Sequence, residues 1–190
     1  MKTLVRLRAR LPLVSDSSAK AWIDLAYVGE WKGHPAGDFA FTESIFQNIV
    51  DRFNAQHNPI PLTYEHPEKD GGQPVPAAGW IHDLKIVNGH LLGLTEFTDR
   101  AASMVKTGEY RYCSVVVDFD SIDRRSGESK GAELFEVGLT NTPFLDGQQP
   151  IQLSARGTQV RVYDITPAPR ALGAFVMPPA EKLFPGARRR

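Results

Sequence analysis

Apolar and polar positions follow the period of an α-helix over residues 42–56. Large apolar side chains recur there three or four positions apart, which places them in one stripe along a helix. Thr42 is placed to cap the first turn, and Glu43 lies in that turn. The pattern therefore predicts an amphipathic helix that packs on a sheet. Its apolar positions are Ile45, Phe46, Ile49, Val50 and Phe53.

Most other segments have the pattern of strands. Residues 79–87 and 90–97 predict two strands, and the Asn88-Gly89 pair between them is a strong signal for a hairpin turn. A short helix is expected over residues 98–106. The predicted fold is α+β, with a largely antiparallel sheet or barrel and helices packed against it. Strands are also expected at residues 21–29, 59–66, 110–119 and 132–140, and a turn-rich loop at 29–38.

The length of 190 residues suits one domain of ordinary size. With 42% hydrophobic and 23% charged residues, the composition is that of a soluble globular protein, which excludes the fibrous and disordered classes. We expect the folded domain at residues 1–154. Residues 155–190 are interrupted by prolines and predict a flexible tail or linker.

Charge is divided unevenly along the chain, although the formal net charge is zero. Residues 1–154 hold 15 Lys and Arg against 20 Asp and Glu, whereas residues 155–190 hold 7 against 2. A basic tail can contact nucleic acid or an acidic partner, but the pattern favours a solvated end.

The apolar runs are too short for a membrane-spanning helix, which needs about 18 consecutive apolar residues. Basic residues interrupt the apolar positions at the N-terminus, so no secretory signal is indicated. With a single cysteine, an internal disulfide is impossible. These observations together predict a cytosolic protein with no membrane partner.

The first candidate nucleophiles lie in residues 109–120, EYRYCSVVVDFD. In this predicted strand the one cysteine of the chain lies beside a serine. Successive side chains of a strand face opposite sides. Cys113 therefore shares a face with Val115, Val117 and a phenylalanine, while Ser114 lies on a face with tyrosines and an aspartate. A buried thiol has a raised pKa and is inert, so Cys113 is predicted to be a core residue and Ser114 the better nucleophile.

A serine hydroxyl needs a base before it can act as a nucleophile. His66 ends the predicted strand 59–66, where the following proline favours an extended conformation. His57 and His90 are expected at the surface, and His34 lies in a loop rich in Gly and Pro. Strand-end histidines are usually structural or surface residues, so the pattern alone leaves the pairing of His66 with a serine as a hypothesis.

The candidate metal ligands are Glu65, His66, His82 and Asp83. No HExxH motif, cysteine pair or similar ligand spacing occurs in the chain. We therefore expect neither a metal nor another cofactor.

Four motifs, in order and spacing, resemble the Mu-like prophage I protein family, the protease and scaffold proteins of phages that build Mu-type heads. The resemblance runs from about residue 20 to 153. The motifs are Tyr64-Glu65-His66, PAAGWI at residues 76–81, Glu109-Tyr110-Arg111-Tyr112 with Ser114, and LTNTP at residues 139–143.

The resemblance implies a serine endopeptidase of capsid maturation with a fold like that of phage prohead proteases and herpesvirus assemblin. It implies Ser114 as the nucleophile and His66 as the general base. Assemblin-type enzymes use a second histidine after the serine, but no histidine follows His90. Related prohead proteases use an acid on a later strand, for which Glu136 is placed; a solvated strand glutamate is the other interpretation.

Strand parity supports the placement of this acid. Phe135, Val137 and Leu139 would form one apolar face of the predicted strand, and Glu136 would lie on the other face with Thr140. A carboxylate on that face can reach an active site, but parity alone does not distinguish this from an exposed position.

The resemblance also implies partners and a location. These are the phage scaffold and major capsid proteins, a possible homodimer, and the host cytoplasm inside the assembling prohead. Two positions depart from the family: Val115 replaces a common proline, and Thr63 replaces an acidic residue. These departures leave open the alternative of an inactive assembly protein with a protease fold.

Overall fold

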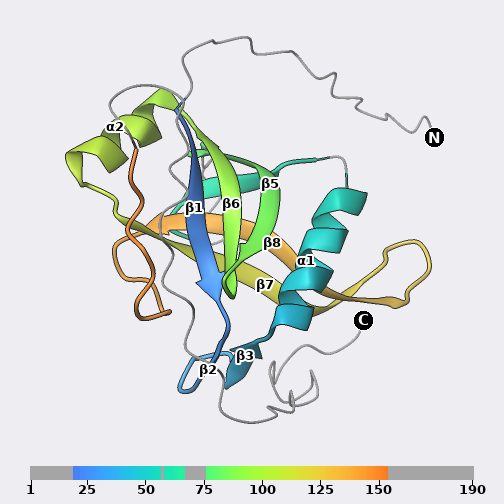
Figure 1. Cartoon of the computed structure of the whole chain (residues 1–190). Coiled ribbons are helices and arrows are strands. Elements are labelled where there is room, and N and C mark those ends of the chain that lie inside the picture. Colours follow the sequence, from blue (N-terminus) through green and yellow to red (C-terminus); the bar gives the residue numbers. More distant parts are fainter. Residues whose placement is uncertain (1–18, 57, 67–75, 154–190) are drawn as a thin grey trace, which may run out of the picture.

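The computed structural model describes residues 19–56, 58–66 and 76–153 (Figure 1). A six-stranded sheet has the order β1-β6-β5-β4-β8-β7, and β2 pairs with β3 in a small second sheet. Only β4 and β8 run parallel among the paired strands described. The strands are β1 (Lys20–Tyr27), β2 (Gly29–Trp31), β3 (Phe39–Phe41), β4 (Ile60–Tyr64), β5 (Gly79–Val87), β6 (His90–Phe97), β7 (Tyr112–Ile122) and β8 (Ser129–Thr140), and the helices are α1 (Glu43–Ala55) and α2 (Asp99–Thr107).

The large sheet is curled like half of a barrel. Its edge strands β1 and β7 contact each other although four strands separate them in the sheet order. The predicted α+β class and the largely antiparallel sheet are therefore confirmed. In the part of the chain that the structure describes, no helix is both long and apolar enough to span a membrane.

The predicted amphipathic helix is α1. Thr42 caps it, because the Oγ1 of Thr42 accepts a hydrogen bond from the backbone N–H of Ile45 at 3.2 Å. Phe46 and Ile49 are buried, and the helix packs against β5 and β8. Replacing a buried aromatic such as Phe46 by alanine typically costs about 3–5 kcal/mol. The apolar stripe therefore anchors α1 to the sheet.

The β5–β6 hairpin and α2 follow the predicted turn chemistry. Asn88 and Gly89 both have positive φ angles, 52° and 79°, as a two-residue type I′ turn requires. Thr98 caps α2, and Gly108 ends it in the left-handed conformation with a φ of 81°. Local sequence signals thus set the boundaries of these elements.

The loop predicted at residues 29–38 is confirmed over residues 32–38, but residues 29–31 form β2. Trp31 in β2 pairs with Phe39 in β3, and their rings stack with centroids 5.6 Å apart. Three-residue strands carry too little alternation to be recognised from sequence, and aromatic contacts stabilise this pair.

The apolar face predicted for residues 132–140 is partly wrong. Val116 pairs with Glu136, but Val117 pairs with Leu134, so Phe135 is an extra residue in β8. Such a bulge shifts the alternation of side chains. As a result Phe135 is 40% exposed, whereas Leu134 is buried.

His90 is also not where the sequence pattern predicted. It is buried rather than exposed, and its Nδ1 lies 3.1 Å from Oδ1 of Asp24, which is also buried. His90 is the first residue of β6 and its ring contacts the ring of Tyr27 on β1. The pairing of β6 with β1 therefore buries His90, although the sequence pattern places this residue in a turn. His57 and the predicted tail lie outside the described residues.

Candidate functional site

Ser114 lies on β7, the edge strand of the large sheet, and is half-buried. It pairs directly with Gly138 on β8, which in turn pairs with Thr63 on β4. Side chains of directly paired residues project from the same face of a sheet. The side chains of Ser114 and Thr63 therefore project from one face, with the glycine between them.

The glycine at position 138 leaves space that His66 occupies. A Cβ atom on Gly138 would lie 2.8 Å from Cε1 of His66 and 2.3 Å from the carbonyl oxygen of Glu65. Both distances are too short for any real side chain. The imidazole of His66 thus lies over Gly138, on the face of the sheet that carries Ser114.

Glu65 directs the chain to this position. Its φ of 55° is in the left-handed region, which is uncommon for a residue other than glycine. Its N–H donates a hydrogen bond to the carbonyl of Leu139 at 2.8 Å, which holds the end of β4 against β8. The turn at Glu65 ends the strand and brings His66 across the neighbouring one.

Glu136 lies two residues before Gly138 on β8 and so projects from the same face. Its Oε1 is 3.0 Å from Nδ1 of His66. The same oxygen is 3.0 Å from the hydroxyl of Thr63, which is also 2.8 Å from the carbonyl oxygen of Glu65. The Thr63 hydroxyl has one proton and donates to one of these acceptors at a time. Glu136 is therefore held between a histidine and a hydroxyl.

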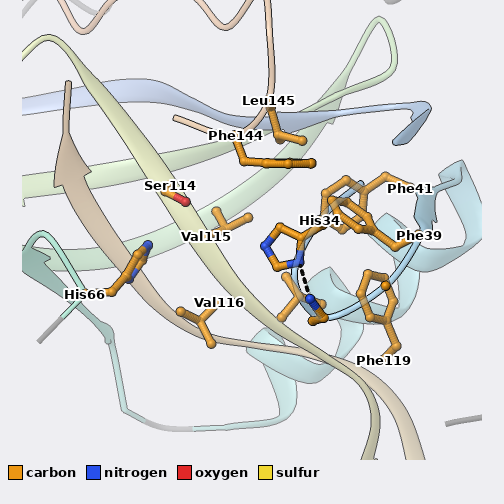
Figure 2. Close-up of a pocket in the computed structure, with 13 residues that line it drawn as sticks. His34, Phe39, Phe41, His66, Ser114, Val115, Val116, Phe119, Phe144 and Leu145 are labelled. Carbon is orange, nitrogen blue, oxygen red and sulfur yellow. Dashed lines mark hydrogen bonds between the residues drawn. The ribbon is translucent and has the colours of Figure 1, made fainter. Parts of the chain in front are cut away.

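Ser114 and His66 line one pocket (Figure 2). The side chain of His66 is 36% exposed and that of Glu136 is 19% exposed. No hydrogen bond joins Ser114 to His66 among the pocket residues drawn in the figure. The structure thus brings Ser114, His66 and Glu136 to one face of the sheet and pairs His66 with Glu136. Ser114 and His66 face the same pocket without a hydrogen bond between them.

The pocket is a cavity of about 370 Å³ with a mostly apolar lining. Figure 2 shows Ser114 and His66 on one side of it and Phe39, Phe41 and Phe119 on the other. Centroids of the rings of Phe39 and Phe41 lie 6.0 and 5.7 Å from that of Phe119. The other lining residues are His34, Ala36, Gly37, Val115, Val116, Val117, Phe144 and Leu145.

His34 lies between the two sides of the pocket (Figure 2). Its Nδ1 accepts a hydrogen bond from the N–H of Ala36 at 3.1 Å, and its ring meets that of Phe144 edge-on at 4.7 Å. Burial lowers the pKa of His34. The lowered pKa favours the neutral imidazole, and because Nδ1 is an acceptor, the proton of that form lies on Nε2.

Cys113 lies on the opposite face of β7, and its prediction as a core residue is confirmed. It is 1% exposed, and its Sγ donates to the carbonyl oxygen of Asp24 at 3.2 Å. Burial, reinforced by the negative charge of Asp24, raises the pKa of the thiol far above its ordinary value. A protonated, inaccessible thiol is not a nucleophile.

The residues weighed as metal ligands are not brought together. His82 pairs with Glu96 at 2.9 Å, away from His66. Within the described ranges, no group of three or more His, Cys, Asp or Glu residues could hold a metal ion.

The sequence interpretation missed the aromatic pocket and the role of Gly138. Glycine in the interior of a strand often marks a close approach of another group, so Gly138 between Val137 and Leu139 was an available signal. The pocket carried no comparable signal, because its walls come from segments far apart in the chain.

No curated protein and no solved structure matches this chain. A family does match: the sequence model described as Mu-like prophage I protein, N-terminal domain, covers residues 23–152. This range is more than half of the chain and includes Ser114, His66 and Glu136. The chain therefore belongs to the Mu-like prophage I protein family.

Proposed function

We propose that this protein is a serine endopeptidase of phage capsid maturation that cleaves scaffold protein and its own chain. One observation carries the proposal: His66 lies over Gly138 with its Nδ1 on the Glu136 carboxylate, on the face of the sheet that carries Ser114. A nucleophile, a base and a group that orients the base are the parts of a Ser–His–acid site.

Each residue has a defined step in this reaction. Glu136 accepts a hydrogen bond from Nδ1–H of His66, which leaves Nε2 unprotonated and able to take the proton of Ser114 as Oγ attacks the scissile carbonyl carbon. The protonated His66 then donates to the leaving amine, and the acyl group stays on Oγ. Water, activated by His66, hydrolyses this ester and regenerates the serine. Glu136 stabilises the imidazolium during both steps.

The reaction requires Ser114 Oγ to come within hydrogen-bond distance of His66. Such bonds are often long in unliganded enzymes and shorten when substrate binds. Thr63 fits this scheme although relatives carry an acid there, because its hydroxyl supports the carboxylate of Glu136.

The fold of phage prohead proteases and assemblin is part of the same proposal. The curled sheet supports it, as does a serine on β7 with a histidine that follows the end of the earlier strand β4. The resemblance further suggests the scaffold and major capsid proteins as partners, self-association as a dimer, and action inside the assembling prohead in the host cytoplasm.

A second candidate is a non-catalytic assembly protein with the same fold. Two observations favour it: no hydrogen bond joins Ser114 to His66 in Figure 2, and a valine stands at position 115. In that case the pocket would remain, but the hydroxyl of Ser114 would not be activated.

A small fluorophosphonate that reacts with activated serines distinguishes the two candidates. We expect the wild-type chain, mixed with scaffold protein, to be labelled at Ser114 as mapped by mass spectrometry, and Ser114→Ala to be unlabelled and unable to cleave scaffold. Ser103→Ala, at an exposed position on α2, is the control and should behave as wild type. Absence of labelling in the wild type, or scaffold cleavage by Ser114→Ala, would overturn the protease assignment.

A further inference from the structure

We propose that the pocket beside Ser114 is the subsite for a large apolar side chain of the substrate, so that the protein selects peptides with an aromatic or long aliphatic residue next to the scissile bond. This inference rests on the proposed function and adds its substrate class. It is carried by the lining of the pocket, its position relative to the serine, and the free edge of β7.

The chemistry of the pocket favours an uncharged apolar occupant. Four phenylalanines line it, together with valine, alanine and leucine side chains. The half-buried imidazole of His34 accepts a hydrogen bond at Nδ1, and its lowered pKa favours the uncharged form, so it offers little charge to a substrate carboxylate. His66 lies at the edge of the pocket and is already paired with Glu136. A charged side chain would lose its hydration here and find no free partner.

The size of the pocket fits one large side chain. Its volume of about 370 Å³ is near the lower end of the range for ligand pockets, about 300–1,000 Å³. A phenylalanine or leucine side chain with some adjoining backbone can fill it. Alanine would leave most of the cavity empty, and the lining would lose those dispersion contacts.

The edge of β7 gives an extended peptide access to the serine. β7 pairs only with β8 and contacts β1 without pairing to it, so in the described part of the chain no backbone hydrogen bond occupies its other edge from Ser114 to Phe119. Extended peptides bind such edges by adding a strand, and their alternate side chains enter neighbouring pockets. A peptide lying along β7 would carry its scissile bond past Ser114 and one side chain toward Phe119.

Peptidyl phosphonates that differ only in the side chain next to phosphorus test the inference. We expect the phenylalanine and leucine analogues to label Ser114 at least about 10-fold faster than the alanine analogue, since differences of one or a few carbons in an apolar pocket are worth about 10–200-fold. The aspartate analogue should be slowest.

Substitutions in the pocket test whether its lining causes the preference for large apolar side chains. Phe144→Ala should lower the rate for the phenylalanine analogue several-fold relative to the rate for the alanine analogue. Phe135→Ala is the matched control, because Phe135 is 40% and Phe144 37% exposed but only Phe144 lines the pocket. Ala36→Leu, which fills the pocket, should remove the preference for phenylalanine over alanine.

The outcomes separate this inference from the proposed function. If the small fluorophosphonate labels Ser114 but all side chains react equally, the subsite is wrong and the protease assignment stands. If no probe reacts, the assignment fails, and the pocket is tested by NMR with N-acetyl-phenylalanine amide. Shifts of the His34 and Phe144 ring signals would support an apolar site, whereas no shift at millimolar ligand would overturn it.

Discussion

Two of the histidine–carboxylate pairs among the described residues have nearly equal distances and lie on opposite sides of β7. His66 and Glu136 are 3.0 Å apart beside Ser114, and His90 and Asp24 are 3.1 Å apart near Cys113. The first pair opens on the pocket, with the His66 side chain 36% exposed. In the second pair the side chains are only 6% and 3% exposed. The distance between histidine and carboxylate is nearly the same in both pairs, so the exposure of the side chains distinguishes the candidate site from the structural pair.

The buried pair has a structural role that the exposed pair lacks. Oδ2 of Asp24 accepts a hydrogen bond from the N–H of Gln149 at 3.2 Å, and Gln148 donates to the carbonyl of Leu25 at 2.7 Å. These bonds attach the segment that follows β8 to β1. The buried carboxylate thus binds a histidine and a backbone N–H of a distant segment, whereas Glu136 binds a histidine and a side-chain hydroxyl.

The largest expected effect separates the two histidines by activity. His66→Ala should reduce the rate of serine labelling about 10²–10⁴-fold, the typical contribution of a general base, with little change in stability. His90→Ala should keep the labelling rate per folded molecule, because His90 does not line the pocket. Equal losses of labelling in both variants would contradict the distinction.

The second effect separates the two carboxylates by stability. Asp24→Ala should lower the free energy of unfolding by about 3–5 kcal/mol, because it breaks a buried pair. Glu136→Ala should cost less than about 1 kcal/mol, since its partner is partly exposed. Urea denaturation measures both changes in the free energy of unfolding. A larger loss for Glu136→Ala than for Asp24→Ala would contradict the structural role assigned to the Asp24–His90 pair.

Gly138 tests whether the position of His66 matters. Gly138→Ala adds a Cβ where Glu65 and His66 already lie, so the imidazole must move. A misplacement of about 1 Å can cost about 100-fold in rate, and we expect a loss of that order in serine labelling. Ala132→Gly, elsewhere on β8, controls for a general weakening of the strand. Unchanged labelling in Gly138→Ala would show that His66 is not the base.

The smallest effect is on the thiol beside the buried pair. The pKa of Cys113 is raised in the folded state, so its contribution to stability is full below the unfolded pKa of about 8.5 and is lost as pH rises above it. Between about pH 8.5 and 9.5 the wild type should lose about 1 kcal/mol more than Cys113→Ala. Equal losses would mean that the thiol ionises in the native protein.

Local chemistry made much of the fold predictable. The cap at Thr42, the Asn88-Gly89 turn and the glycine after α2 each act within a few residues, and the elements that they bound appear in the structure. The bulge at Phe135 and the burial of His90 depend on pairing with distant strands. Sequence alternation contains no information about either.

The candidate site divides in the same way. Strand parity separated Ser114 from Cys113 correctly, because adjacent side chains of a strand always diverge. The contact of His66 with Glu136 depends on the left-handed turn at Glu65 and the space at Gly138, which join β4 to β8. These requirements are met only after the strands have paired, so spacing along the chain could not predict them.

The most direct test of the central claim is a crystal structure of the protein after reaction with the phenylalanine phosphonate. The account predicts phosphorus bonded to Oγ of Ser114, Nε2 of His66 about 2.6–3.2 Å from an oxygen of the adduct, and the phenyl group in the aromatic pocket. An adduct on another residue, or His66 turned away from Ser114 in the complex, would contradict it.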